Sequence, residues 1–353
     1  MLSHSLIIIN IVRDTILKTP MKQSVIAGIA HYVPEKVVTN NDLKEFMETS
    51  DEWIQERTGI QQRRYYDPET DTTANMGTKA ALKALERAGM SKDDVDFIVF
   101  ATLSPDYYFP GGGVSVQDQL GIREVGALDV RNQCSGFIYG LSVADQFIKT
   151  GMYKTVLVIG SEIHSSGLDM STTGRNVSVI FGDGAGAAVL TASDDKEKGI
   201  LSTHLHSEGK YAEELIVKDP GSSGKERLTT EMMQEGGGVF PYMNGNFVFK
   251  HAVTRFPEVI MEALQTNGYS PEDVDVLVPH QANLRITQFV SKKMGLDESK
   301  VVSNIQNYGN TTAASIPIAL SEAWESGKVK EGDLVCLAAF GSGFTWASAL
   351  IRW

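Results

Sequence analysis

Apolar and polar positions along the chain repeat a unit that predicts a helix, a turn and a buried strand, in that order. Residues 84–99 (ALERAGMSKDDVDFIV) and 263–278 (ALQTNGYSPEDVDVLV) share this unit at a constant offset of 179 positions. In each copy a Gly and then a Ser follow the helical pattern, and a continuous apolar run comes next, typical of a strand buried on both faces of a sheet. The identical pairs are Ala84 and Ala263, Leu85 and Leu264, Gly89 and Gly268, Ser91 and Ser270, Asp94 and Asp273, Val95 and Val274, Asp96 and Asp275, and Val99 and Val278.

A second match occurs at the same offset. Leu141, Ser142 and Ala144 correspond to Leu320, Ser321 and Ala323, and each trio lies in a helical pattern before an apolar run, TVLVIG (155–160) or DLVCLAAF (333–340). Two matches at one offset indicate an internal duplication. We therefore predict an α/β protein of two similar halves, residues 21–195 and 196–353, with right-handed crossovers and a ligand site in the cleft where strand-end loops meet.

Residues 1–20 lie outside this pattern. Their apolar patch, 6–12, is interrupted by Asn10 and is too short to span a bilayer, and the segment lacks the basic start and cleavage site of a secretory signal. We predict a disordered or non-native extension here, with the fold beginning at Met21.

Composition narrows the possible functions. With 32 Lys and Arg against 44 Asp and Glu, the net charge is −12 and the pI is near 5.1, which disfavours nucleic acid as a general partner because a negative surface repels phosphate. A hydrophobic fraction of 42% disfavours disorder. Two cysteines cannot build a disulfide framework, so we predict a cytoplasmic protein with no membrane partner.

Cys134 is the first candidate for chemistry. It stands between an apolar segment, 127–130, and a helical pattern that starts at Ser135. The first turn of a helix favours an anion, so we predict a thiol of lowered pKa and a nucleophile, the alternative being a small buried hydrophobic residue. Cys336, inside the apolar run VCLAAF, is expected to be structural.

His280 and Asn310 are the partners that such a thiol would need. His280 follows the apolar run VDVLVP, at a position where the other copy of the repeat has Ala101, and the alternative role is that of a core histidine. Asn310 lies three residues before Ala313, which the offset pairs with Cys134. An asparagine amide can donate to a developing oxyanion or enolate without titrating, although it can equally cap a helix.

No cofactor or metal motif accompanies these residues. FGDGAGAAVL (181–190) runs into a strand-like segment rather than a helix and lacks the G-x-G-x-x-G spacing, and no phosphate-binding G-x-x-x-x-G-K-[ST] occurs. Two distant cysteines without paired histidines give no recognisable metal site. We predict that the protein uses neither.

Together, CSGF at Cys134, PHQANLRI at His280 and NYGNTTAASIP at Asn310 resemble the Cys, His, Asn triad of β-ketoacyl-acyl carrier protein synthase III, a thiolase-like condensing enzyme family. The segments 49–60, 178–190, 244–253 and 341–353 are also similar to that family. The resemblance implies a duplicated βαβαβ fold in five layers, α-β-α-β-α, and a homodimer. It also implies a decarboxylative Claisen condensation of an acyl-CoA with malonyl-acyl carrier protein, initiating fatty acid biosynthesis through an acyl-Cys134 intermediate.

Further roles follow from the same resemblance. It implies that the backbone N–H groups of Cys134 and Ser342 form an oxyanion hole, and that coenzyme A, a substrate here, binds along one group of residues: Trp53, Arg57, Arg175, Gly245, Phe249 and Asn283. The acyl pocket is assigned to Phe109, Gly111, Gly112, Gly113 and Phe340. Lys250, Arg285, Lys292 and Lys293 form a basic patch that could receive an acidic carrier protein despite the net negative charge.

Two departures from the family pattern bear on the acyl substrate. Gly111, Gly112 and Gly113 stand where family members usually carry larger residues, and Arg131, Asn132 and Gln133 replace small residues before the cysteine. Because three glycines would free volume, we predict a primer larger than acetyl. The alternatives are a specialised condensing enzyme of secondary metabolism with a longer, branched or aromatic primer or a β-keto partner, a thiolase, which would need a second catalytic cysteine, and a non-catalytic acyl-binding protein.

Overall fold

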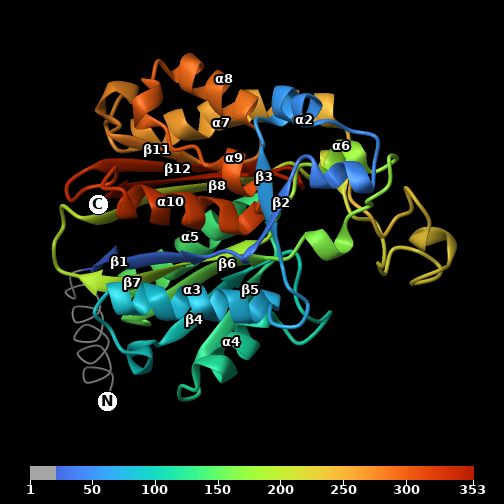
Figure 1. The fold of residues 1–353 in the computed structure, drawn as a ribbon. Helices are drawn as coiled ribbons and strands as arrows, with labels where there is room; N and C mark the ends of the chain where they lie inside the picture. The colour runs from blue at the N-terminus through green and yellow to red at the C-terminus, as the bar shows by residue number, and fades with distance from the viewer. Residues whose placement is uncertain (1–20) are drawn as a thin grey trace, which may run out of the picture.

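A five-stranded mixed sheet forms the centre of the N-terminal half in a computed structural model that describes residues 21–353 (Figure 1). The extension predicted for residues 1–20 lies outside the described residues. Strand β4 is parallel to β5 and β6, whereas β7 is antiparallel to β6 and β1. The order across the sheet is β1 (Gln23–Tyr32), β7 (Gly184–Ser193), β6 (Thr155–Glu162), β4 (Phe97–Ala101) and β5 (Gly126–Val130).

The C-terminal half has a second sheet with the same order. Its strands are β11 (Val276–Pro279), β12 (Leu334–Gly341), β13 (Thr345–Arg352) and β8 (Gly199–Ser207), and Val301 adds an isolated parallel bridge to Leu277 at the outer edge of β11. The first sheet read from its other edge is β5, β4, β6, β7, β1, and the second is the Val301 bridge, β11, β12, β13, β8. If the strands of each sheet are numbered in chain order and the bridge is counted as one of them, both sheets have the order third, second, fourth, fifth, first. The duplication predicted from the sequence is therefore confirmed in the topology.

The offset of 179 residues holds at the level of single elements. Strand β6 maps onto β12 at both ends, and the 3-10 turn Gln133–Ser135 maps onto Thr312–Ala314. Helices α5 (Gly136–Lys149) and α10 (Ser315–Glu325) begin at equivalent positions directly after these turns. The two turns therefore occupy corresponding places in the two halves.

Five layers result from the way the helices cover the sheets (Figure 1). Helices α3 (Thr73–Arg87) and α4 (Gly112–Leu120) pack on the outer face of the first sheet, α5 and α10 lie between the sheets, and α7 (Gly245–Thr266) and α8 (Leu284–Met294) cover the outer face of the second. The predicted α-β-α-β-α fold is confirmed.

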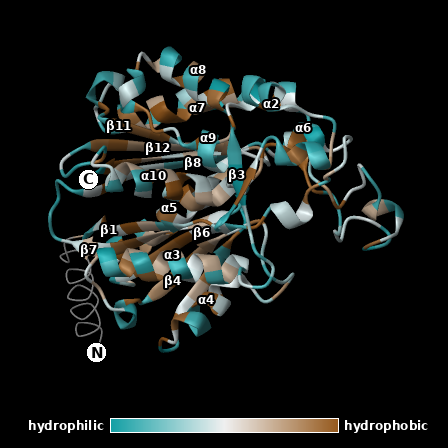
Figure 2. Cartoon of the chain, viewed as in Figure 1, coloured by the Kyte–Doolittle hydropathy of each residue, from teal (hydrophilic) through white to brown (hydrophobic). Residues whose placement is uncertain are grey.

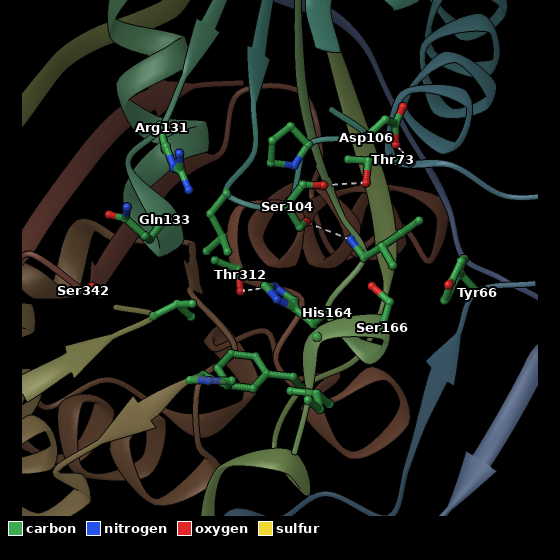
Figure 3. Close-up of a pocket in the computed structure, with 18 of the residues that line it drawn as sticks. Tyr66, Thr73, Ser104, Asp106, Arg131, Gln133, His164, Ser166, Thr312 and Ser342 are labelled. Carbon is green, nitrogen blue, oxygen red and sulfur yellow. Dashed lines mark hydrogen bonds between the residues drawn. The ribbon is translucent and has the colours of Figure 1, made fainter. Parts of the chain in front are cut away.

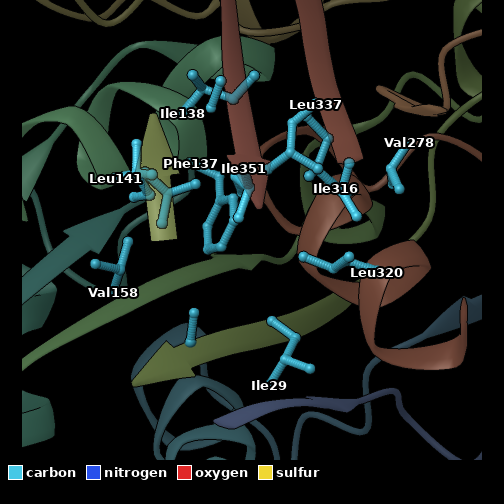
Figure 4. Close-up of a cluster of buried hydrophobic side chains, with 14 of the residues drawn as sticks. Ile29, Phe137, Ile138, Leu141, Val158, Val278, Ile316, Leu320, Leu337 and Ile351 are labelled. Atoms are coloured by element: carbon cyan, nitrogen blue, oxygen red, sulfur yellow. The ribbon is translucent and has the colours of Figure 1, made fainter. Parts of the chain in front are cut away.

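The central layer holds the largest part of the core. Phe137 and Leu141 of α5 and Leu320 of α10 are buried against apolar side chains from both sheets (Figure 4). Burying an aliphatic or aromatic side chain contributes about 1.5–3 kcal/mol, so these helices hold the two halves together. Hydrophobic residues concentrate on the strands and on the helix faces toward them (Figure 2).

Shorter elements gather at one end of the layers. They are β2 (Lys36–Thr39), α2 (Asp51–Thr58), β3 (Gln62–Tyr65), α6 (Arg175–Ser178), β9 (Leu215–Ile216), β10 (Tyr242–Met243) and α9 (Ile305–Tyr308). Between residues 21 and 353, no helix is both long and apolar enough to cross a membrane.

Candidate active site

Cys134 lies in the turn between β5 and α5, directly under the end of β12. Gly341, the last residue of β12, leaves room for it: a Cβ at that position would stand 2.8 Å from the sulfur. The backbone N–H groups of Cys134 and Ser342 both act on the thiol, lowering its pKa. Two backbone donors at one sulfur are the arrangement that an oxyanion hole requires, because the carbonyl of an acyl-cysteine forms at this place.

The predicted lowering of the Cys134 pKa is wrong. Burial, followed by the nearby carboxyl of Glu162, raises the pKa of this thiol to about 12, and the two N–H groups offset only part of that rise. The helix-terminus argument considered the local backbone alone, whereas the thiol is enclosed by the second half of the molecule. The free protein therefore holds Cys134 as a thiol. Cys336 is also free and buried, in β12, as expected of a structural residue.

His280 leaves β11 at its carboxyl end and is held by both its backbone and its ring. Its N–H donates to the carbonyl of Ala338 at 2.8 Å, and Nδ1 lies 2.5 Å from the hydroxyl of Ser315 at the start of α10. That hydroxyl accepts a 3.4 Å bond from the N–H of Gln281, so its own hydrogen is available to Nδ1. A proton donated to Nδ1 leaves the imidazole proton on Nε2.

Nε2 of His280 is buried and has no hydrogen-bond partner among the described residues. Burial lowers the pKa of this imidazole to about 3, so the ring is neutral at physiological pH. An unpaired buried donor costs about 1–3 kcal/mol, and native proteins accept that cost mainly at functional sites. The geometry presents one N–H group, fixed in direction, to whatever enters the site.

Asn310 precedes the turn that corresponds to the Cys134 turn, and it does not cap a helix. Its Oδ1 accepts a 2.9 Å bond from the N–H of Thr312, and its backbone is tied to Phe181 and Ile180. With Oδ1 engaged, the amide nitrogen is the part of the side chain left to donate.

The two turns bring these three residues together. A Cβ at Gly136, the first residue of α5, would lie 3.5 Å from Cβ of Ala313, so the Cys134 turn packs against the turn that follows Asn310. Ser315, which holds the His280 ring, starts the helix directly after that second turn. The Cys134 turn, the turn after Asn310 and the Ser315 hydroxyl that holds His280 therefore lie next to one another where the halves join, although His280 and Asn310 do not line the cavity that opens beside Cys134.

A cavity of about 820 Å³ opens on one side of Cys134 (Figure 3). Cys134 and Ser342 line it, with residues from the loop 103–107, the segment 163–168, and Phe181 and Thr312. None of the six residues assigned to coenzyme A lines this cavity. It therefore extends away from the predicted coenzyme A side, where the acyl end of a thioester would point.

Trp53, Arg57 and Arg175 form one aromatic and cationic group. The guanidinium carbons of Arg57 and Arg175 lie 4.4 and 5.1 Å from the centre of the Trp53 ring. Both polar atoms of the Asn283 side chain are bonded within the protein. Its Nδ2 donates to the carbonyl of Arg57, and its Oδ1 accepts from the N–H of Arg285, so Asn283 is the N-cap of α8. Gly245 begins α7, and Phe249 lies one turn farther along, its ring 5.8 Å from the Arg285 guanidinium carbon.

The glycines assigned to the acyl pocket do not widen it. A Cβ at Gly111 would lie 2.6 Å from the Asp129 carboxyl group, and one at Gly112 would lie 2.5 Å from the Phe100 ring. The N–H groups of Gly112 and Gly113 donate to Asp129 at 2.6 and 2.9 Å. These glycines let the start of α4 close on β5 and β4, so the argument from freed volume is wrong.

Phe109 and Phe340 also lie elsewhere. Phe109 is 80% exposed and does not line the cavity. Phe340 shares the β12 face of Cys336 and Ala338, which packs toward α7 and α8, and its ring lies 4.9 Å from that of Phe344. Alternation along β12 turns Phe340 away from the cavity.

The basic patch lies on the outer layer. Lys250 of α7 and Arg285, Lys292 and Lys293 of α8 are exposed. Phe289, one helical turn from both Arg285 and Lys293, is 45% exposed, so the patch has an apolar centre that the sequence analysis did not identify.

Comparisons with known proteins give the family. Models described as 3-oxoacyl-[acyl-carrier-protein (ACP)] synthase III and its C-terminal domain match residues 128–209 and 264–353. A β-ketoacyl-[acyl-carrier-protein] synthase III from Rhodospirillum centenum is 48% identical over 334 residues, which cover 94% of this chain and 99% of the relative. The chain belongs to the β-ketoacyl-acyl carrier protein synthase III family. The synthase III from Citrobacter koseri is 47% identical, over 93% of this chain and 98% of its own.

Solved structures agree with this assignment. The crystal structure of the synthase III from Aquifex aeolicus matches with a TM-score of 0.86 at 43% identity, over 94% of this chain and all of the other. The priming β-ketosynthase of the R1128 polyketide pathway matches with a TM-score of 0.84 at 32% identity, over 95% and 98% of the two chains. The thiolase-like condensing fold is thereby confirmed, and the protein is an acyl-transferring enzyme of this family.

Two buried titratable groups of this synthase were missed by the sequence analysis. Glu162 ends β6, and its carboxyl accepts hydrogen bonds from Thr102 Oγ1 at 3.1 Å, Ser104 Oγ at 2.5 Å and the N–H of Ala313 at 3.4 Å. Burial raises its pKa to about 7. The rule that selected His280, a polar residue at the end of an apolar run, would also have selected Glu162.

His164 is the second missed residue. Its Nε2 lies 2.6 Å from Thr312 Oγ1, its ring packs 4.9 Å from that of Phe181, and burial lowers its pKa to about 4. The imidazole therefore enters the cavity wall as a neutral group, and it braces the residue whose N–H fixes Asn310.

Proposed function

We propose that this enzyme joins an acyl group from coenzyme A to malonyl-acyl carrier protein by decarboxylative Claisen condensation, with Cys134 as nucleophile and His280 and Asn310 as the donors to the enolate. The observation that carries this assignment is the buried Nε2 of His280, which has no hydrogen-bond partner among the described residues, together with an Asn310 side chain whose Oδ1 is already bonded and whose amide nitrogen is left to donate. Two neutral donors suit an enolate, whose negative charge appears only as the reaction proceeds. The family relationship supports the same reaction.

In the first half-reaction the Cys134 sulfur attacks the thioester carbonyl of acyl-CoA. The N–H groups of Cys134 and Ser342 receive the oxyanion as the new carbon–sulfur bond forms. When the carbon–sulfur bond to coenzyme A breaks, the thiol proton of Cys134 ends on the coenzyme A sulfur. The exchange is neutral overall, so no charge remains in the buried site.

In the second half-reaction malonyl-acyl carrier protein replaces coenzyme A. His280 Nε2 and Asn310 Nδ2 donate to its thioester oxygen while carbon dioxide leaves and its bonding electrons form the enolate. The enolate carbon then attacks the acyl carbonyl, and the carbon–sulfur bond to Cys134 breaks as the β-ketoacyl product forms. Protein donors hold each developing charge, so the proposed chemistry needs no added cofactor.

The substrates have separate supports on the surface. Trp53, Arg57 and Arg175 offer an aromatic face and two cations to the adenine and phosphates of coenzyme A. The patch of Lys250, Arg285, Lys292 and Lys293 fits an acidic carrier protein, and the exposed Phe289 adds an apolar contact at its centre. Such a patch lets an acidic enzyme attract an acidic partner locally.

A homodimer through β5 completes the proposal. This strand is an edge of its sheet and carries the exposed Leu128, and Phe109, in the loop after β4, is also exposed. An unprotected edge with apolar residues favours pairing with a second copy. The use of a reduced thiol also fits the cytoplasm predicted from the unpaired cysteines.

Mass spectrometry of the intact protein tests the reaction. Incubation with acyl-CoA should add one acyl mass, and Cys134→Ser should abolish the gain. With malonyl-acyl carrier protein, His280→Ala and Asn310→Ala should each retain the acyl-enzyme but release product about 10²–10³-fold more slowly. An acyl gain that persists in Cys134→Ser, or full condensation by His280→Ala, would overturn the assignment.

A further inference from the structure

The cavity beside Cys134 has a mixed lining, in which apolar side chains accompany a group of polar residues. The apolar ones include Leu103, Ile163, Leu215, Val217 and Val239. Figure 3 shows Arg131 and Gln133 on one wall, Tyr66 and Ser166 on the opposite wall, and His164 between them. Apart from Nε2 of His164, none of the polar side-chain atoms of these five residues has a hydrogen-bond partner among residues 21–353. These groups are available to a ligand.

The acidic residues of the same wall are already satisfied. Asp71 forms an ion pair with Lys79 at 2.9 Å and accepts from the Tyr32 hydroxyl. Asp106 accepts from the N–H groups of Thr73 and Ala74 at the start of α3, at 2.6 and 3.0 Å. Both carboxylates are neutralised by the fold, so the cavity does not select for a cation.

Arg131 is the one charged group of the lining that lacks an ion pair or hydrogen bond within the described part of the chain. It stands three residues before Cys134, directly after β5, and it is exposed in the single chain. An exposed guanidinium at the opening can meet the far end of a chain whose thioester carbon is on Cys134. A guanidinium pairs best with a planar carboxylate, which it can hold through two parallel bonds.

The volume of the cavity and the hydrogen-bonding needs of its polar residues also favour an acyl group that ends in a carboxylate. A cavity of about 820 Å³ is far larger than a two-carbon acetyl group requires. A longer hydrocarbon chain would pack on the apolar lining but would offer no hydrogen bond to Arg131, Gln133 or Ser166. An acyl group that ends in a carboxylate fills the space and restores a bond to the guanidinium.

We propose that the acyl group taken by this enzyme carries a terminal carboxylate, received by Arg131 at the opening of the cavity with Gln133 beside it. This inference rests on the proposed function, because it assigns the acyl substrate of the Cys134 site. The carboxylate takes no part in the bond changes: the Cys134 carbon–sulfur bond forms, the coenzyme A carbon–sulfur bond breaks and the thiol proton moves to coenzyme A.

Matched thioesters test the proposal with the full-length protein. The initial rate of Cys134 acylation is measured by intact-protein mass spectrometry with succinyl-CoA against butyryl-CoA, and glutaryl-CoA against valeryl-CoA. In each pair the lengths agree and only the terminal carboxylate differs. We expect the carboxylated thioester to react about tenfold faster or more in at least one pair, with a preference that weakens as salt is raised.

Variants of one residue assign the preference. Arg131→Gln should bring the rate ratio within a pair to about one or below, and Arg131→Lys should keep part of it because the charge remains. Arg123→Gln is the matched control: Arg123 is an exposed arginine outside the cavity, paired with Asp96, and its loss should leave the ratio unchanged.

The possible failures are distinct. Acylation by butyryl-CoA at a rate equal to or above that of succinyl-CoA, with the same result for the longer pair, overturns the carboxylate proposal and leaves the proposed function intact. A preference that survives in Arg131→Gln overturns the role of Arg131. Absence of acylation by every thioester, with the protein folded, overturns the proposed function and this inference with it.

Discussion

Replacing Gly341 by alanine changes the position of the Cys134 thiol, the proposed nucleophile, without changing the thiol itself. The backbone at this position lies outside the left-handed region, so alanine is compatible with its conformation, and only space is at issue. The added methyl group would lie 2.6 Å from Cβ and 2.8 Å from Sγ of Cys134, where ordinary contact begins at 3.4 Å. The Cys134 turn must therefore move by several tenths of an ångström at both atoms.

That displacement sets the expected size of the effect. Inserting a methyl group into a packed site costs typically about 1–3 kcal/mol of folding free energy. Misplacing a reacting group by about 1 Å can cost roughly 10²-fold in rate, so Gly341→Ala should acylate Cys134 about 10- to 100-fold more slowly. The sulfur would also leave the two backbone N–H groups that would hold the oxyanion.

Single-turnover acylation followed by intact-protein mass spectrometry measures the rate, and urea unfolding measures the stability. Gly209→Ala is the matched control, because a Cβ at Gly209 meets nothing within 4 Å and its backbone is also outside the left-handed region. An acylation rate for Gly341→Ala equal to that of the wild type, in a protein unfolding at the same urea concentration, would refute the reasoning that Gly341 makes room for the thiol.

Further predictions concern a tautomer, a pH dependence and a surface. Ser315→Ala should slow condensation about 10-fold and leave acylation unchanged, because the hydroxyl that fixes the His280 tautomer is lost; equal losses in both half-reactions would contradict this. Burial lowers the folded-state pKa of His164 to about 4 and that of His280 to about 3. Below pH 6.5 the unfolded chain therefore binds protons that the folded chain does not, and both histidines reduce the free energy of unfolding as the pH falls. Burial raises the pKa of Glu162 to about 7, and this carboxyl offsets the loss from one histidine because the folded chain binds its proton first. His164→Leu should therefore gain stability relative to wild type by up to about 1.4 kcal/mol per pH unit as the pH falls from 6.5 to 4, measured by urea unfolding, and a constant difference would exclude this. Lys292→Glu should raise KM for malonyl-acyl carrier protein several-fold at low salt without changing acylation by acyl-CoA, and an effect that salt does not reduce would argue against docking there.

The features that the sequence predicted best are those that depend on short stretches of chain and occur in both halves. The helix, turn and apolar-strand unit occurs at one offset, and the strands and turns of the structure obey it. His280 could be selected because a polar residue at the end of a buried strand lies at the edge where loops gather. Asn310 could be selected because its turn matches the Cys134 turn.

The features that sequence missed depend on what another segment brings. The pKa of Cys134 is set by enclosure under β12 and by Glu162, neither of which is near it in the chain. Gly111 and Gly112 look like a flexible loop until Asp129 and Phe100 are placed against them. An argument from the local backbone predicts that a helix terminus lowers the pKa of Cys134, but it does not predict the burial that the other half of the molecule imposes on the thiol.

The group of polar residues in the cavity lining has the same origin. Arg131 and His164 are separated along the chain and belong to different loops, so no spacing rule joins them. Only the packing of β5, β6 and the second turn places them around one cavity. A list of catalytic motifs therefore identifies the reaction more readily than it identifies the acyl group.

At the offset of 179 residues, Gly341 corresponds to Glu162 and Cys134 to Ala313. In one pair the bare Gly341 of the C-terminal half faces the Cys134 thiol of the N-terminal half. In the other, the Glu162 carboxyl of the N-terminal half accepts a hydrogen bond from the N–H of Ala313 in the C-terminal half. Each pair joins the two halves, and the two pairs are not interchangeable, because a side chain at position 341 would meet Cys134. A thiol at position 313 would therefore lie beside the Glu162 carboxyl and not beside a bare position, so moving the nucleophile to the equivalent turn would require a change at position 162 as well as at position 313.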